Sequence, residues 1–123
     1  MNNLKVETVP VDSLSPDPAN VRRHPERNLD AIKASLRRFG QQKPIVVDAK
    51  GIIRAGNGTL EAAKALGWDS IAVVRSGLAG SEATAFAIAD NRTSELAEWA
   101  GAALAEQLRS LQSEDFDLDS VGY

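Results

Sequence analysis

The sequence lacks several residue types and patterns on which enzymes commonly depend. Its 123 residues include no cysteine, which excludes disulfides, thiolate metal sites and cysteine nucleophiles. The single histidine, His24, gives no basis for a zinc site without cysteine or a second histidine. Neither the Gly-x-Ser-x-Gly pattern of serine hydrolases nor the Gly-x-x-x-x-Gly-Lys-Ser/Thr pattern of P-loop proteins is present. We therefore expect no metal site.

Long apolar runs are also missing. No run approaches the roughly 20 residues that a membrane-spanning helix needs, and the first residues lack a basic-then-apolar signal pattern. We therefore predict a cytoplasmic protein with no membrane partner. The proportions of hydrophobic (43%) and charged (25%) residues are ordinary for one globular domain. We predict one domain over residues 1–123, with a core at about 6–75, a helical extension at about 81–112 and an acidic tail at 113–123.

The net charge of −3 conceals an uneven distribution. Residues 20–43 contain seven Lys or Arg against two acids, so this segment carries +5; residues 77–123 contain two Arg against nine acids, so this end carries −7. The basic segment suits phosphate groups, whereas the acidic end opposes loose binding to DNA. The alternative is a solvated helix face followed by an acidic tail.

Periodicity predicts the first helix and the strands. Apolar residues recur every three or four positions from Leu29 to Phe39, which indicates an amphipathic helix that starts between Pro25 and Asn28 and ends before Gly40. Strands are expected near residues 6–11 and 71–74. Two further apolar runs, 45–47 and 52–53, flank residues 48–51 and predict a hairpin.

The C-terminal part is predicted to be helical. Ser81 is a favourable N-cap for a helix from Glu82 to about Asn91, which Asp90, Asn91 and Arg92 would close. A second helix is expected from about Gly101 to Gln112. In the tail, apolar and acidic residues alternate, so we expect its Phe and Leu side chains to pack on the body of the protein.

The most informative segment runs from Pro44 to Gly67. The second hairpin strand leads into Gly56-Asn57-Gly58 and then into a helix. Glycines let the backbone approach a ligand closely, and the N-terminus of the following helix favours an anion. Purely conformational roles for these glycines are the alternative. Glu61, one turn into the helix, is a candidate base or metal carboxylate, or it complements the helix N-terminus.

The order of these motifs resembles the N-terminal domain of ParB proteins, whose fold is shared with sulfiredoxin. The resemblance covers roughly residues 6–74. It includes VDSLSPDPANVR (11–22), similar to the opening box of the family, and PIVV (44–47), similar to its Gly-x-x-Gln-Pro-Ile-x-Val motif. AGNGTLEAA (55–63) and ADNR (89–92) are closer still to the small stand-alone ParB-like proteins of phages and mobile elements, known as ParB-like nuclease domain proteins.

The resemblance implies an α+β fold with a small mixed sheet, flanking helices and a helical C-terminal extension. It also implies a nucleotide, CTP or ATP with Mg²⁺, held between the glycine loop and the turn before Pro44. The residues that it places at the nucleotide or its phosphates are Arg22, Arg23, Gln42, Lys43, Gly56, Asn57, Gly58 and Thr59. Asp90, Asn91 and Arg92 would contact these binding residues and not the nucleotide itself.

The sequence also departs from the family. Segregation ParB has Gly-Glu-Arg-Arg-x-Arg where this chain has residues 56–61, so three arginines are absent, and sulfiredoxin chemistry is excluded because it needs a cysteine. We therefore expect a nucleotide- or nucleic-acid-binding domain with weak or no catalysis, acting in a DNA-related process such as plasmid, phage or chromosome maintenance, or DNA modification. Its expected partners are a nucleotide, DNA, a DNA-modifying protein and a second copy of the chain.

Two alternative functions are also compatible with the sequence. The first is an enzyme of the same fold, either a metal-dependent nuclease or an NTP-using small-molecule kinase, in which Glu61 works with Asp90. The second is a protein-interaction module without a nucleotide, whose contact surface is the acidic C-terminal part.

Overall fold

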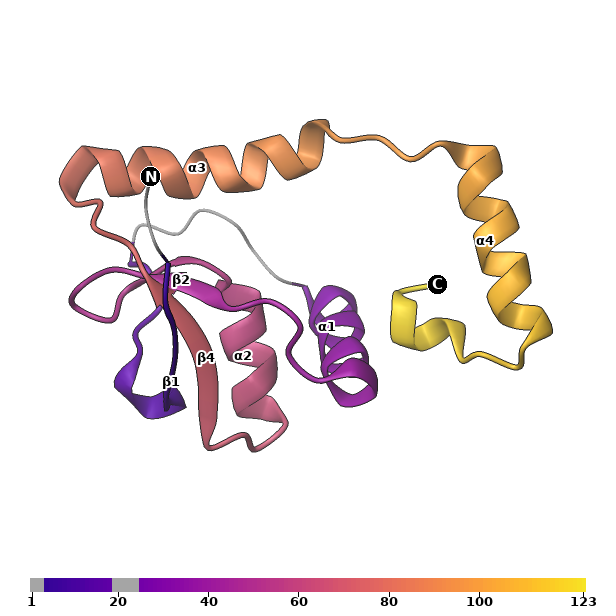
Figure 1. Ribbon diagram of the computed structural model, residues 1–123, viewed down its shortest axis with the longest axis horizontal. Coiled ribbons are helices and arrows are strands. Elements are labelled where there is room, and N and C mark those ends of the chain that lie inside the picture. Colours follow the sequence, from indigo (N-terminus) through magenta and orange to yellow (C-terminus); the bar gives the residue numbers. More distant parts are fainter. Residues whose placement is uncertain (1–3, 19–24) are drawn as a thin grey trace.

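The computed structural model describes residues 4–18 and 25–123, which form a four-stranded sheet with helices around it (Figure 1). The strands, in the spatial order β1-β4-β2-β3, are β1 (Val6–Pro10), β4 (Ser70–Arg75), β2 (Ile45–Val47) and β3 (Ile53–Ala55). The helices are α1 (Glu26–Phe39), α2 (Asn57–Ala65), α3 (Gly80–Leu96) and α4 (Gly101–Ser113), with short 3-10 turns η1 (Val11–Ser13) and η2 (Leu118–Val121). The predicted α+β fold with a mixed sheet and a helical C-terminal extension is confirmed.

The sheet is mixed because of how its strands are connected. β4 pairs antiparallel with β1 and parallel with β2, whereas β2 and β3 form an antiparallel hairpin. Parallel neighbours need a long crossover, and here β3 and α2 provide it between β2 and β4. This path brings the end of β3 and the start of α2 beside the segment that precedes β2.

The hairpin turn is organised by Asp48. Its Oδ1 accepts hydrogen bonds from the backbone N–H groups of Lys50 (2.8 Å) and Ile52 (3.0 Å), and its carbonyl accepts one from Gly51 (3.1 Å). Such side-chain bonds to the nearby backbone are the reason that Asp favours turns. Ile52 was predicted to start the second strand. It pairs instead with Ser15 of residues 14–18, here called the N-terminal arm, and β3 begins at Ile53.

A compact apolar core lies between the sheet and the first two helices. The largest of its fully buried side chains, each at most 2% exposed, are Val47, Ile53, Leu60, Ile71 and Val73. Each such burial contributes roughly 1.5–3 kcal/mol. The apolar stripe of α1 faces this core through Leu36, which is buried, and Ile32, which is half-buried.

α3 is longer than the sequence predicted. It begins at Gly80, so Ser81 lies in the first turn and is not the N-cap, and it continues past Arg92 to Leu96. Asp90, Asn91 and Arg92, which were expected to end it, lie within the helix. Beyond them, the hydroxyls of Thr93 and Ser94 donate to the carbonyls of Ala89 (2.8 Å) and Asp90 (3.1 Å). Such back-bonding satisfies hydroxyl groups without ending a helix.

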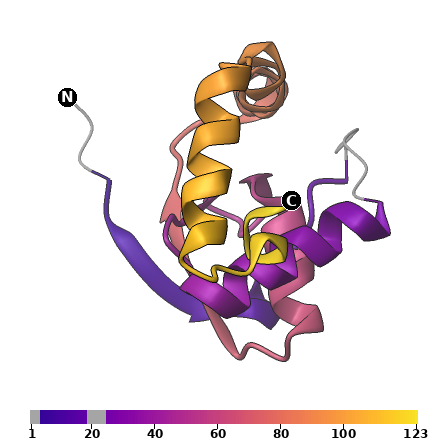
Figure 2. The same cartoon turned by 90° about the vertical axis from the view of Figure 1, so that its right-hand side faces the viewer.

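The C-terminal extension leaves the sheet and returns to α1. α3 crosses above the sheet, α4 descends from its far end, and η2 then contacts α1 (Figures 1 and 2). The ring of Phe116 stacks on that of Phe39 with centroids 6.3 Å apart, as expected for an apolar tail residue that packs on the body. Among the described residues, no helix combines the length and the apolar character needed to cross a membrane.

Candidate functional site

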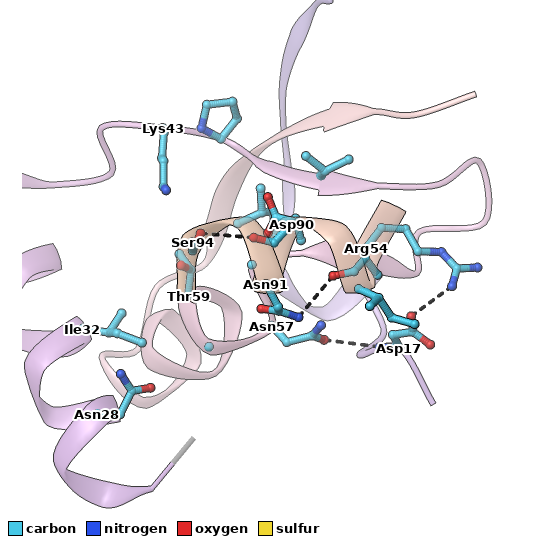
Figure 3. Close-up of a pocket in the computed structure, with 18 of the residues that line it drawn as sticks. Asp17, Asn28, Ile32, Lys43, Arg54, Asn57, Thr59, Asp90, Asn91 and Ser94 are labelled. Carbon is cyan, nitrogen blue, oxygen red and sulfur yellow. Dashed lines mark hydrogen bonds and ion pairs between the residues drawn. The ribbon is translucent and has the colours of Figure 1, made fainter. Parts of the chain in front are cut away.

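A pocket of about 470 Å³ lies where the N-terminus of α2 meets β2 and α3 (Figure 3). This volume is within the usual range for small-molecule sites. The residues before β2 and at the start of α2 form one side, and one face of α3 forms the other. The lining polar residues are Asp17, Asn28, Lys43, Arg54, Asn57, Thr59, Thr84, Asp90, Asn91 and Ser94.

Gly56 creates the floor of this pocket. Its φ of 109° lies in the region that favours glycine, and its carbonyl accepts the first helical bond of α2, from Leu60 (3.0 Å). A Cβ at this position would clash with the Ile45 side chain of β2, so only glycine lets the two segments lie this close. The first backbone N–H groups of a helix have no partner within it. Those of α2 belong to residues that line the pocket.

Lys43 is positioned by its neighbour Gln41. The Gln41 amide exchanges two hydrogen bonds with the backbone of Ala72 in β4, donating to its carbonyl (2.9 Å) and accepting from its N–H (2.8 Å). The same amide also donates to the carbonyl of Lys43 (3.1 Å). Gln41 therefore ties the turn before Pro44 to the sheet, and Lys43 projects toward the pocket (Figure 3).

We expect Gln41→Ala to lower the free energy of unfolding by about 1–3 kcal/mol, because the half-buried backbone of Ala72 loses two partners. Gln42→Ala is the matched control, since the exposed Gln42 amide makes one bond, to the carbonyl of Phe39 (2.7 Å). Urea unfolding followed by circular dichroism measures both losses. Equal losses would contradict the role assigned to Gln41.

An ion triad lies at one end of the pocket. Arg54, whose side chain is 15% exposed, pairs with Asp17 (3.0 Å) and with Asp48 (3.1 Å). Burial acts to raise the pKa of Asp48, but hydrogen bonds from the backbone of Ile52 and Lys50 together with the Arg54 guanidinium outweigh it, so that pKa lies below its ordinary value. The Nε of Arg54 is buried without a hydrogen-bond partner in the described part of the chain.

Asn57 links the triad to α2. Its Oδ1 accepts a hydrogen bond from the backbone N–H of Asp17 (3.3 Å). Asp17 is therefore held twice, by its carboxylate on Arg54 and by its backbone on Asn57. The N-terminal arm is thereby fixed against the start of α2, at the edge of the pocket (Figure 3).

The structure brings together most of the residues predicted for the site. Gly56, Asn57, Gly58, Thr59 and Lys43 line the same pocket, and Asp90 and Asn91 line it from α3. Three predicted residues do not line it: Glu61 is exposed on α2, Gln42 bonds to the end of α1, and Arg92 pairs with Glu95 on α3. Arg22 and Arg23 lie outside the described residues. A ligand-binding or catalytic role for each of these residues stays a prediction.

Sequence reasoning missed several lining residues. Arg54 was overlooked although a charged residue in the apolar run of β3 is a signal in itself, since buried charges need partners. Asp17 was given no role of its own within residues 11–22. Thr84 lies on the α3 face toward the pocket, and Ser94 lies beyond the end predicted for that helix. Within the described ranges, no three His, Asp or Glu side chains are grouped so as to hold a metal ion.

Comparison with known proteins identifies the family to which this chain belongs. Residues 1–92 match the ParB N-terminal domain. The chain therefore belongs to the ParB N-terminal domain family, as the order of its motifs predicted. It is 38% identical over 71 residues to the ParB-like nuclease domain-containing protein YnaK of Escherichia coli (strain K12), a match that covers 58% of this chain and 82% of YnaK.

Solved ParB structures share the fold. The C-terminally truncated chromosome-partitioning protein ParB of Caulobacter crescentus, complexed with CTP-γ-S, superposes with a TM-score of 0.82 over 96% of this chain and 71% of that one, at 21% identity. The same ParB complexed to the centromeric parS site superposes with a TM-score of 0.58 over 69% of this chain and 46% of that one, at 24% identity. At these identities the likeness establishes the fold alone.

Proposed function

We propose that this chain binds a nucleotide through its phosphate groups at the N-terminus of α2 and acts in a DNA-related process. The observation that carries the proposal is the pocket of about 470 Å³ in which the first turn of α2, Lys43 and Thr59 converge. Helix N-termini bind phosphate because their N–H groups and the helix dipole both favour an anion. The CTP-γ-S complex of the Caulobacter ParB supports a nucleotide as the ligand class.

Each pocket residue has a role in this proposal. Gly56 brings the backbone close, Gly58 adds no side chain between Asn57 and Thr59, and Thr59 donates its hydroxyl. Lys43, from the segment before β2, supplies a cation beside them. Mg²⁺, if it accompanies the nucleotide, would neutralise phosphate charge, and Asp90 is the α3 carboxylate of the kind that holds such an ion.

Weak or absent catalysis follows from the charges of the pocket. Of the described cations that line it, Arg54 is already paired with Asp17 and Asp48, which leaves Lys43 to meet a phosphate. Asp90 on the facing helix adds a negative charge. A triphosphate would therefore be held here mainly by neutral donors. Charge-assisted hydrogen bonds are roughly twice as strong as neutral ones, so this site holds phosphate less strongly than one with several free cations. We propose binding without efficient turnover.

Thermal-shift titrations with ATP, CTP, GTP and ADP, with and without Mg²⁺, test the binding. We expect at least one nucleotide to raise the melting temperature, Lys43→Ala to weaken its binding about tenfold, and Thr59→Arg to strengthen it. Lys64→Ala, which removes an exposed cation in the last turn of the same helix, is the matched control. If no nucleotide shifts the wild type or Thr59→Arg, the nucleotide proposal is wrong.

An enzyme remains the second candidate because Asp90 lines the pocket. Turnover as a metal-dependent nuclease or small-molecule kinase would then depend on Asp90, and on Glu61 only if that exposed residue reaches the ligand. Assays of Asp90→Asn and Glu61→Gln for Mg²⁺-dependent NTP turnover and DNA nicking separate the two roles. Absence of turnover in the wild type would remove this candidate.

Partners are proposed on separate grounds. DNA is suggested by the parS complex of the related ParB. A protein partner or a second copy of the chain is suggested by three large apolar side chains exposed along α3 and its following linker, namely Ile88 (56%), Leu96 (62%) and Trp99 (71%). The cytoplasmic location and the link to phages or mobile elements stay predictions from the sequence.

A further inference from the structure

A second pocket, of about 490 Å³, adjoins the first. The two pockets share Ile32, Lys43 and Thr59, so the lysine and the threonine proposed to meet phosphate also face this second space. Its other walls come from α1, from the turn after α1, and from the C-terminal segment. The residues that only the second pocket has are Ala31, Ser35, Leu36, Phe39, Gly40, Gln41, Gln42, Ser120, Val121 and Gly122.

The two spaces differ in chemistry. The first pocket is bordered by a helix N-terminus and by acidic, basic and amide side chains. Apolar groups dominate the second pocket, where Ile32, Leu36 and Phe39 face Val121, and Lys43 is the cation among its lining residues. A ligand that reaches from one to the other would therefore meet polar donors at one end and apolar surface at the other.

Three aromatic contacts hold the C-terminal segment that lines the second pocket in place. Phe116 stacks on Phe39 of α1, and the Arg38 guanidinium lies 4.1 Å from the centre of the Phe116 ring. At the end of the chain, the ring of Tyr123 contacts Trp99 edge-on, with centroids 6.5 Å apart. Trp99 follows α3, so this contact joins the segment that lines the second pocket to the helix that lines the first.

Ser120 completes the attachment. It is 4% exposed, and its hydroxyl donates to the carbonyl of Asp117 (2.6 Å), which closes the η2 turn. Val121 and Gly122 follow directly and line the pocket. The wall is thus a built turn seated on α1 and not a loose chain end.

We infer that residues 116–123, here called the C-terminal wall, form part of the ligand site and contact the uncharged ring of a ligand whose anionic groups lie at the N-terminus of α2. The inference rests on the proposed function and extends it. A nucleotide has the required two-ended chemistry, with a flat heterocyclic base at one end and phosphates at the other. The base lies in the second pocket, and the C-terminal wall determines how strongly it is held.

The inference predicts a difference between two probes. Inorganic tripolyphosphate carries the anionic groups without a ring, so it needs the first pocket alone, whereas CTP or ATP needs both. Isothermal titration of the full chain with tripolyphosphate and with each nucleotide measures the advantage that the ring provides. We expect that advantage to be about tenfold or more in the wild type.

Two variants test the C-terminal wall. Phe116→Ala removes its aromatic contacts with α1 without changing a lining residue, and Val121→Ala removes apolar surface from the pocket itself. Both are expected to abolish most of the ring advantage and to leave tripolyphosphate affinity within about twofold of the wild type. Leu78→Ala is the control, because Leu78 is an exposed apolar residue that lines neither pocket.

The outcomes separate this inference from the proposed function. Loss of nucleotide affinity alone supports the inference. Equal weakening of both probes, or an unchanged ring advantage in Val121→Ala, overturns it and leaves the anion site standing. If Phe116→Ala does not fold, Val121→Ala decides the question. If the wild type binds neither probe, the proposed function fails and the inference fails with it.

Discussion

Gly56→Ala is expected to destabilise the protein by about 2–6 kcal/mol, the sum of two separate effects. At a φ of 109° an alanine is strained, and its Cβ would lie 2.7 Å from the Cβ of Ile45 and closer still to Cγ2. Ile45 is 3% exposed in β2 and belongs to the apolar core, so displacing its side chain would disturb its core neighbours. Because a domain of this size is typically stable by about 5–15 kcal/mol, this one methyl group removes a large part of its stability.

Gly67→Ala separates strain from collision. Gly67 also has a positive φ, of 79°, but a Cβ there would meet nothing within 4 Å. Gly67→Ala is therefore expected to lower the free energy of unfolding through strain alone, by about 1–2 kcal/mol. Urea unfolding measures both variants. Equal losses would mean that the contact between Gly56 and β2 is not as tight as the structure has it.

Arg54→Met is the second large expected effect. It leaves Asp17 and Asp48 buried without their shared cation, and breaking a buried ion pair in this way typically costs about 3–5 kcal/mol. Methionine keeps an apolar stem as long as that of arginine up to Nε, so packing along β3 is largely preserved. Arg92→Met is the matched control, because Arg92 pairs with Glu95 on the exposed face of α3, where an ion pair contributes at most about 1 kcal/mol.

The effect of Arg54→Met on stability is also expected to depend on pH. The folded pKa of Asp48 is lowered, so the stability that it contributes is fully present above its unfolded pKa near 3.9 and is lost as the pH falls through the folded value. The difference in stability between the wild type and Arg54→Met should therefore be largest near neutral pH and shrink below about pH 4. A difference that does not change with pH would exclude the ion triad as its cause.

Local patterns were enough to predict much of the fold and part of the site. The spacing of Leu29, Ile32, Leu36 and Phe39 defined α1, and the paired apolar runs defined the hairpin. Because the two strands of a hairpin run side by side, Lys43 before the first strand lies near the glycines after the second, and both line one pocket. Such inferences need only the neighbours of a residue in sequence.

Contacts between distant segments were beyond local patterns. Arg54 meets Asp17, 37 positions earlier, only because the N-terminal arm pairs through Ser15 with Ile52. Phe116 was expected to pack on the body, but its partner Phe39 depends on the length of α3 and the direction of α4. The end of α3 was mistaken because Thr93 and Ser94 bond back to helical carbonyls, an arrangement that composition does not reveal.

The two tryptophans of the chain lie in different surroundings. Trp68 packs against the core, whereas Trp99 is 71% exposed and touches Tyr123 at the end of the C-terminal wall. Their fluorescence therefore carries two signals, one from the sheet and helices and one from the seating of the last residues. In a chain that retains only Trp99, emission would follow the chain end alone, so its release could be watched while the rest of the molecule stays folded.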